Sequence, residues 1–127
     1  MNTKELMSRY SAGQRDFRNL NLMAANLRNL NLSGANLSGA NLTKANLTRT
    51  NLSHTNLTEA TLVGANLTET NLMRANLTNA DLSEANVSDA NLSYASLRGA
   101  KMTDGVSASA VSKASQSVSV GAVEQSK

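Results

Sequence analysis

The 127-residue chain has no cysteine, no tryptophan and no proline, and its only aromatic residues are Tyr10, Phe17 and Tyr94. The absence of cysteine excludes disulfides, thiolate nucleophiles and sulfur-ligated metal ions, and it is compatible with a reducing compartment. With an aromatic content of 2%, a core of mixed aromatic and β-branched residues is excluded as well. Leucine and alanine must therefore fill the interior.

Histidine is nearly absent, since His54 is the only one in the chain. A Ser-His-Asp arrangement would have to use it, and a metal site could draw on one imidazole only. We interpret His54 as a solvent-facing residue. The sequence also has no glycine-rich phosphate loop, Walker motif or dinucleotide-binding fingerprint. We therefore expect a protein that is not an enzyme and that has no cofactor and no metal site.

Two kinds of apolar segment are also missing. Residues 1–7 carry a charge of each sign and lack the apolar run of a signal peptide. No stretch approaches the roughly 18 consecutive apolar residues that a membrane span needs, and the mean hydropathy is -0.31. We expect a soluble protein located in the cytoplasm, with no membrane partner.

The most prominent feature of the sequence is a five-residue repeat that runs unbroken from Arg15 to Asp104, eighteen times. The central residue is leucine in fifteen repeats, and the other three centres are Phe17, Val87 and Met102. The residue before the centre is Asn in thirteen repeats, and the residue two before it is small in most of them. By its length the chain is expected to be one domain, in which the repeats form residues 15–104.

A period of five fits neither of the common secondary structures. In an α-helix, five residues rotate the side-chain direction by about 140° beyond a full turn, so the centres would not form one stripe. In a strand, an odd spacing places successive centres on opposite faces. The chain must therefore turn within every repeat, with inward residues such as Ala35 and Leu37 on a short extended segment. Coils of this kind can stack and pair as parallel strands about 4.7–4.9 Å apart.

The repeats also resemble a known motif. Ala-Asn-Leu-Ser-Gly at 35–39, Ala-Asn-Leu-Thr-Arg at 45–49 and Ala-Asp-Leu-Ser-Glu at 80–84 are similar to the A(D/N)LXX motif of pentapeptide-repeat proteins. The resemblance implies an all-β solenoid, the right-handed quadrilateral parallel β-helix of that family, with four pentapeptides in each square coil. Eighteen repeats would then make about four and a half coils.

Residues 1–14 are expected to form a short N-terminal capping helix. Asn2 can act as the N-cap with Glu5 as its acidic partner, and the helix is expected to end near Gly13. One of its faces suits the open first coil and comprises Leu6, Met7 and Tyr10. Such a cap prevents edge-to-edge association of a solenoid. The stretch 5–17 also resembles the N-terminal leader of small cyanobacterial pentapeptide-repeat proteins.

After Gly105 the five-residue register ends and the composition changes to Ser, Val and Ala. We interpret residues 105–127 as a flexible tail. The alternative is a last strand or loop that covers the C-terminal edge, which the alternating sequence Ser-Val-Ser-Val at 117–120 favours.

The net charge of +3 conceals an asymmetry along the chain. Residues 1–54 contain seven Lys and Arg against two acidic residues, whereas residues 55–104 contain three against six. If the repeats stack in order, the molecule has a basic end and an acidic half. We interpret this as surface charge that favours solubility.

In the family's geometry, the residue two after each centre points outward, so residues twenty apart form columns on four faces. The column Gly34, His54, Arg74 and Tyr94 differs from the others. Arg74 beside Tyr94 can form a cation–π contact, and Arg and Tyr are frequent hot-spot residues at interfaces. With Met73 as an outward apolar neighbour, we predict a partner surface that comprises His54, Met73, Arg74 and Tyr94.

A second column contains two carboxylates, Glu69 and Asp89, one coil apart. Such a pair could suggest acid–base chemistry. Arg49 lies one coil before them in the same column, so an ion ladder is the favoured interpretation, and exposed pairs of that kind contribute only about 0–1 kcal/mol.

Two classes of function remain. Similarity to cyanobacterial members, some of which act in the regulation of cell differentiation, favours a non-catalytic module that binds a protein partner. The alternative is a DNA mimic that interacts with topoisomerases, as other pentapeptide-repeat proteins do. A mimic needs a long acidic surface in place of phosphates, which the net charge of +3 disfavours.

Direct binding of nucleic acid agrees with the pI of about 9.6. However, the basic residues are dispersed over four faces and rings for base stacking are nearly absent. We therefore do not expect a nucleic acid partner. Whether the protein is a monomer or an end-to-end dimer is left open by the sequence.

Overall fold

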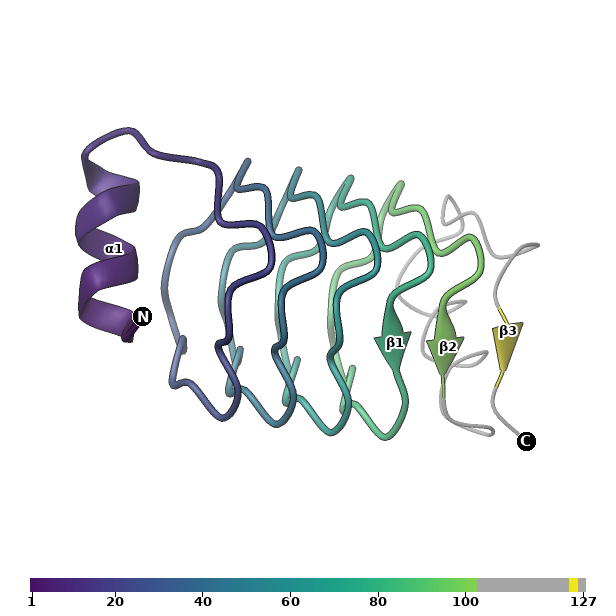
Figure 1. Ribbon diagram of the computed structural model, residues 1–127. Coiled ribbons are helices and arrows are strands. Elements are labelled where there is room, and N and C mark those ends of the chain that lie inside the picture. The colour runs from purple at the N-terminus through teal and green to yellow at the C-terminus, as the bar shows by residue number, and fades with distance from the viewer. Residues whose placement is uncertain (103–123, 126–127) are drawn as a thin grey trace.

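A computed structural model describes residues 1–102 and the backbone of residues 124–125. The elements are α1 (Thr3–Ser11), β1 (Asp81–Leu82), β2 (Lys101–Met102) and β3 (Glu124–Gln125). Helix α1 stands at one end of a row of similar coils, and the three short strands lie side by side at the other end (Figure 1). The strands are short because the chain turns within every repeat.

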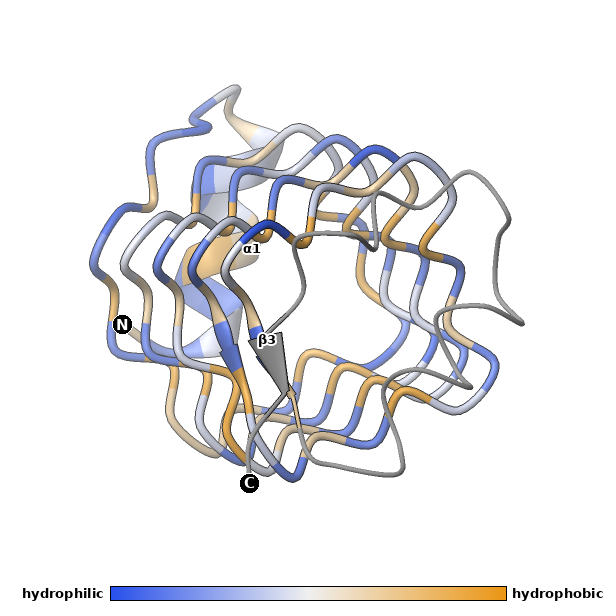
Figure 2. Cartoon of the chain, turned by 90° about the vertical axis from the view of Figure 1, so that its right-hand side faces the viewer, coloured by the Kyte–Doolittle hydropathy of each residue, from blue (hydrophilic) through white to orange (hydrophobic). Residues whose placement is uncertain are grey.

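Residues twenty apart in the sequence pair as parallel neighbours. The bridges run in one register from Asp16↔Asn36 to Asn76↔Ser96, and β1 pairs with β2 in the same register through Asp81↔Lys101. One coil therefore contains twenty residues, or four repeats, as expected. Figure 2 looks along the stack, and the coils follow one another with the same outline.

The backbone N–H groups of an inner repeat with Asn before its centre find acceptors, as the repeat 45–49 illustrates. The N–H groups of Asn46, Leu47 and Arg49 donate to carbonyl oxygens of neighbouring coils at 2.8–2.9 Å. The N–H of Ala45 donates to the carbonyl oxygen three residues earlier at 3.0 Å and closes a turn. The N–H of Thr48 donates to the side-chain Oδ1 of Asn46 at 3.1 Å. The coil thus satisfies its donors without a long strand.

The last of these hydrogen bonds explains the Asn before each centre. Its Oδ1 accepts the N–H two residues later, which is an Asx turn that supports the corner. In the repeat of Asn46, the Thr48 hydroxyl donates to the same oxygen at 2.7 Å. Asp81 has the same role, since its Oδ1 accepts the Ser83 N–H at 3.0 Å. A carboxylate can therefore replace the amide at this position.

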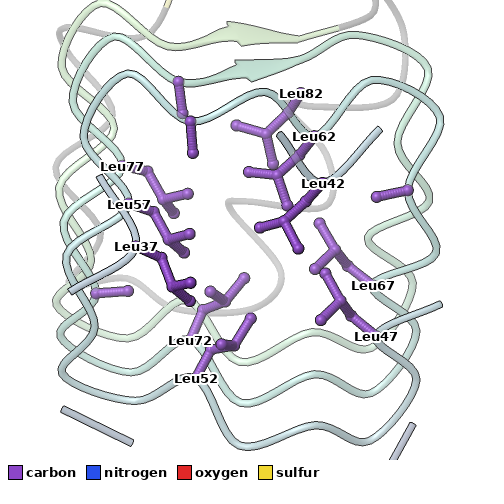
Figure 3. Packing of buried hydrophobic residues seen from close by; sticks show 14 of the residues in the cluster. Leu37, Leu42, Leu47, Leu52, Leu57, Leu62, Leu67, Leu72, Leu77 and Leu82 are labelled. Atoms are coloured by element: carbon purple, nitrogen blue, oxygen red, sulfur yellow. The ribbon is translucent and has the colours of Figure 1, made fainter. Parts of the chain in front are cut away.

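The core consists of the repeat centres, which are buried from Phe17 to Met102. The leucines of successive coils stack in four columns that point toward one another (Figure 3). The residue two before each centre is also inward, and from Ala35 onward it is a buried Ala or Thr. Buried threonines satisfy their hydroxyls on the backbone, as Thr50 does by donating to the Leu27 carbonyl oxygen at 2.6 Å. The predicted interior of leucine and small residues is confirmed.

The helix expected within residues 1–14 is present as α1. The Oδ1 of Asn2 accepts the Glu5 N–H at 2.8 Å, as predicted for the N-cap. The Glu5 carboxylate pairs with Arg9 at 2.7 Å within the helix. The helix ends shortly before Gly13, whose φ of 101° is the left-handed conformation that glycine adopts readily.

Two side chains of α1 donate to backbone carbonyls of the first coil. The Tyr10 hydroxyl donates to the Ser33 carbonyl at 2.6 Å, and Thr3 Oγ1 donates to the Asn26 carbonyl at 3.1 Å. In the next coil, the carbonyls at the same two positions accept backbone N–H groups of the preceding coil. The helix therefore supplies donors that a preceding coil would otherwise supply.

Apolar and cationic contacts add to this attachment. Leu6 is fully buried, and Met7 and Tyr10 are partly buried against the core. The Arg15 guanidinium lies 3.7 Å from the centroid of the Tyr10 ring and donates to the Tyr10 carbonyl at 2.9 Å. The predicted apolar face of the helix is thus the face that contacts the repeats. Within the described residues, no helix has both the length and the apolar character that a membrane span requires.

At the other end, β3 pairs in parallel with β2 through Lys101↔Glu124 and Met102↔Gln125. These two residues of β3 belong to the segment interpreted as a tail, and they agree with the alternative of a last strand at the C-terminal edge. Residues 103–123 and 126–127, including the alternating sequence at 117–120, lie outside the described residues, so their interpretation stays a prediction.

The Asx turn leads to a test of the repeat motif. Asn46→Ala should lower the free energy of unfolding by about 1 kcal/mol, because the Thr48 N–H and hydroxyl lose their protein acceptor. Asn46→Asp keeps the acceptor oxygen and should remain close to the parent protein. Urea denaturation of both variants measures the difference. Equal losses would show that the side-chain acceptor is not what stabilises the corner.

Candidate partner surface

The outward residues of the coil are presented by tight turns. Each turn contains a repeat centre and the next three residues. In the turns whose centres run from Leu22 to Leu97, the N–H of the fourth residue donates to the carbonyl of the first at 3.0–3.3 Å. The third residue has a φ of 56–77° in every repeat from Asn19 to Gly99, and it is the only residue of the turn with a positive φ. This is the pattern of a type II turn, which favours Gly or Asn at that place. Ten of the seventeen corners from Asn19 to Gly99 have neither Gly nor Asn, and their side chains are held in a strained conformation.

The corner residues of successive coils stack in four columns, because the register is twenty residues. We number the columns in chain order. Corner 1 contains Asn19, Gly39, Glu59, Asn79 and Gly99; corner 2 contains Ala24, Lys44, Gly64 and Glu84; corner 3 contains Asn29, Arg49, Glu69 and Asp89; and corner 4 contains Gly34, His54, Arg74 and Tyr94.

Corner 3 contains the predicted ion ladder. Arg49 Nη1 lies 3.4 Å from Glu69 Oε1, and Arg49 Nε donates to Asn29 Oδ1 at 3.1 Å. The side chains of Arg49 and Glu69 are 54% and 49% exposed, so the pair adds little stability. Because Glu69 pairs with a cation of the neighbouring coil, the interpretation as a ladder, and not as an acid–base pair, is supported.

Corner 4 contains the predicted cation–π contact. The Arg74 Cζ lies 4.7 Å from the centroid of the Tyr94 ring. His54 and Arg74 are exposed, and Tyr94 is 57% exposed. Three of the four predicted surface residues therefore lie in one exposed column.

Met73 differs from the prediction in part. It precedes Arg74 in the turn, but its side chain is half-buried, so it offers less apolar surface than an outward residue would. The exposed methionine of the repeats is Met23, at 55%, which sequence reasoning did not single out. The two residues occupy the same place in their repeats, so the five-residue register alone could not distinguish them.

Corner 4 is also distinct in charge. Corners 1, 2 and 3 each contain at least one carboxylate, whereas corner 4 contains none. The column on one side of corner 4 is uncharged and comprises Ser33, Ser53, Met73 and Ser93. The column on the other side begins with Asp16, which is paired with Arg18, and continues with the uncharged residues Asn36, Asn56, Asn76 and Ser96. In the described part of the chain, the ion pairs are Glu5–Arg9, Asp16–Arg18 and Arg49–Glu69. The Arg74 guanidinium thus has no carboxylate partner there.

One pair of residues with shifted pKa values, Asp16 and Arg18, lies at the first repeat. Arg18 donates to both carboxylate oxygens of Asp16 at 2.8 Å. These hydrogen bonds lower the pKa of Asp16 below its ordinary value and raise the pKa of Arg18. The side chains of Arg18 and Asp16 are 58% and 62% exposed, and the pair is a local contact between residues two apart in the sequence. Within residues 1–102 and 124–125, no three acidic, His or Cys side chains gather as a metal site would require.

The family model for pentapeptide repeats matches residues 21–58, 35–72 and 70–104, with eight copies. The chain belongs to the pentapeptide-repeat family. Proteins of this family fold as right-handed β-helices, and the coarse fold predicted from the sequence is therefore confirmed. No curated protein is significantly similar to the chain.

Two cyanobacterial pentapeptide-repeat structures are similar to it. HetL from Nostoc sp. PCC 7120, a protein involved in heterocyst differentiation regulation, is 40% identical over 80% of this chain, with a TM-score of 0.50. This chain spans 47% of the length of HetL. The protein alr5209 from Nostoc PCC 7120 is 35% identical, with 83% of each chain covered and a TM-score of 0.47.

A third similar structure is QnrB1, a plasmid-mediated fluoroquinolone resistance protein. It is 22% identical over 88% of this chain and 58% of its own length, with a TM-score of 0.60. At that identity the similarity concerns the fold alone.

The left-handed corners predict opposite effects for two substitutions at corner 4. Gly34→Ala should lower the free energy of unfolding by about 1 kcal/mol, because a β-carbon is disfavoured at positive φ. Crowding does not contribute, since a β-carbon there would meet nothing within 4 Å. Tyr94→Gly should cause no loss and up to about 1 kcal/mol of gain, because the relief of strain offsets the lost cation–π contact. If urea denaturation shows a large loss for Tyr94→Gly, Tyr94 stabilises the fold and the corner is not free for another role.

Proposed function

We propose that this pentapeptide-repeat protein is a non-catalytic module that binds a protein partner through corner 4. The observation that carries the proposal is the Arg74–Tyr94 stack. Tyr94 is a large, exposed side chain in a backbone conformation that glycine would adopt with less strain. Arg74 lies over its ring and is not paired with a carboxylate of the described chain. Neither side chain fills the interior.

The chemistry of the other residues supports a binding role. The inward positions from Ala35 to Met102 are apolar side chains or threonines whose hydroxyls donate to the backbone, so they offer no reactive group. Enrichment of Arg and Tyr is typical of the energetically important residues of protein interfaces. HetL is involved in the regulation of heterocyst differentiation, and we propose by analogy that this chain acts in regulation by binding. The cytoplasmic location stays a prediction.

A DNA mimic that interacts with a topoisomerase is the alternative expected from the sequence. Such a mimic needs closely spaced negative charges along its surface. Among the described corners, the longest acidic run is Glu69 and Asp89 in corner 3, and Glu69 is paired with Arg49. The likeness to QnrB1 concerns the fold and gives this alternative no further support.

Glycine substitutions can separate binding from folding. A tagged double variant, Arg74→Gly with Tyr94→Gly, should remain folded but lose a partner that the parent protein captures from a lysate of its source organism. The matched control, Arg49→Gly with Glu69→Gly at corner 3, should capture the same partner. Quantitative mass spectrometry of the captured proteins measures the difference.

Two results would contradict the proposal. One is a partner that the corner 4 variant retains as well as the parent does. The other is inhibition of gyrase supercoiling at low micromolar concentrations of the protein, which would support the DNA mimic instead.

We further propose that α1 caps the first coil and prevents edge-to-edge association. Deletion of residues 1–14 uncovers the Asn26 and Ser33 carbonyls and Leu30, which is partly buried against the core at this end of the stack. Since open edges pair with one another, the truncated protein should have a higher mass than the full chain in size-exclusion chromatography with light scattering. Tyr10→Phe removes one hydrogen bond and should lower stability by about 1 kcal/mol without changing the mass. A truncated protein of unchanged mass would refute the capping role.

A further inference from the structure

We infer that corner 4 recognises an acidic, extended segment of the partner protein. This inference rests on the proposed function, because it concerns the chemistry of the partner at the same surface. It follows from the charge of the corner, the contact of the Arg74 guanidinium with the Tyr94 ring, and the hydrogen bonds of the backbone N–H groups of His54 and Arg74.

The charge of corner 4 favours a negatively charged partner. Arg74 is a permanent cation, and His54 precedes it by one coil. Corner 4 contains no carboxylate, and in the described part of its two flanking columns the one carboxylate is Asp16, which lies at the first repeat and is paired with Arg18. At corner 3, by contrast, Arg49 lies 3.4 Å from Glu69. A carboxylate that approaches the molecule is therefore attracted to corner 4, where no carboxylate of the described residues is paired with Arg74.

The cation–π contact with Tyr94 restricts the Arg74 side chain and leaves its N–H groups available to a carboxylate. A guanidinium over a ring keeps its N–H groups in its own plane, where they can donate to both oxygens of a carboxylate. Because the stack already restricts the side chain, less conformational entropy is lost when the partner binds. The exposed Tyr94 ring, together with the half-buried Met73, offers an apolar contact beside that ion pair.

The partner must be held by side chains and not by strand addition. The His54 N–H donates to the Met73 carbonyl at 2.9 Å, and the Arg74 N–H donates to the Ser93 carbonyl at 2.8 Å. These backbone donors of the corner are already paired with the next coil. A partner strand would therefore find no free N–H ladder at this corner.

The length of the column indicates a short segment. His54 and Tyr94 are two coils apart, which is about 10 Å at strand spacing. An extended peptide rises about 3.3 Å per residue, so three or four residues span the column. The side chains of corner 4 lie in one column, so an extended peptide can run along them. Such a peptide would place a carboxylate opposite Arg74 and an apolar residue opposite Tyr94.

A nucleic acid is the less favoured occupant. Phosphate recognition requires several basic residues along one path, and base stacking requires several rings. Corner 4 has one ring and one arginine, and the other ring outside the core, Tyr10, is covered by Arg15 at the α1 end. Lys44 and Arg49 belong to other corners. The corner thus fits a short acidic peptide better than a phosphate backbone.

Synthetic peptides can test the inference directly. The probe is a fluorescein-labelled ten-residue peptide of alternating Glu and Leu, with a Gln and Leu peptide and a ten-nucleotide oligothymidine as references. Fluorescence anisotropy should detect binding of the acidic peptide, and binding should weaken as the salt concentration rises. Arg74→Gln should weaken it about tenfold, as expected for the loss of a charge-assisted hydrogen-bonded pair. The matched control, Arg49→Gln, removes the same charge at corner 3 and should change the affinity by less than about twofold.

The variant Tyr94→Leu tests whether binding of the acidic peptide depends on the Arg74–Tyr94 contact or on the charge of Arg74 alone. It keeps the cation and an apolar side chain but removes the ring that orients Arg74, so acidic-peptide binding should weaken about threefold or more. Circular dichroism of each variant verifies that the fold is intact.

Several results would overturn the inference. These are equal losses for Arg74→Gln and Arg49→Gln, equally tight binding of the Gln and Leu peptide, or tighter and Arg74-dependent binding of oligothymidine. If the acidic peptide does not bind while lysate capture still depends on corner 4, the acidic segment is wrong and the proposed function stands. If lysate capture does not depend on corner 4, the proposed function itself fails.

Discussion

Hydrogen bonds between coils hold this structure together, and the rest of the architecture depends on their constant register of twenty residues. Three of the five N–H groups in an inner repeat donate to neighbouring coils, as in the repeat 45–49, and all are near 2.8–2.9 Å there. That register places each leucine over the leucine twenty residues earlier, so the core forms four columns. The same register places each corner side chain over another. Interior and surface are therefore ordered by one set of backbone contacts.

The turns connect this backbone pattern to the surface. The corner residue has its N–H bonded to the next coil and its φ in the left-handed region, and its side chain points away from the core. Corner side chains consequently contribute little to packing. At corner 3 they form a ladder of opposite charges through Arg49 and Glu69, whereas at corner 4 Arg74 stacks on Tyr94. Corners 3 and 4 have the same backbone conformation, but they differ in the charge and ring contacts that they can offer to a partner.

The five-residue period predicted the stacked parallel coils and the leucine interior, and the family resemblance implied the outward column that contains His54, Arg74 and Tyr94. The success of the period has a physical reason, since each position in the repeat has one environment. The period could not predict features that depend on where a repeat lies along the stack. Met23 and Met73 occupy the same place, yet Met23 is the more exposed. The bonds from Thr3 and Tyr10 to the first coil also lie outside the repeat pattern, because they join a helix to an edge.

The left-handed corner residues have a consequence for how such a molecule can change over evolutionary time. Glycine is the least strained residue at these places, so a larger side chain there adds a small and local penalty that does not reach the leucine columns. Substitutions at separate corners should then combine additively. A lineage could exchange one binding chemistry for another, a corner at a time, through intermediates that all remain folded.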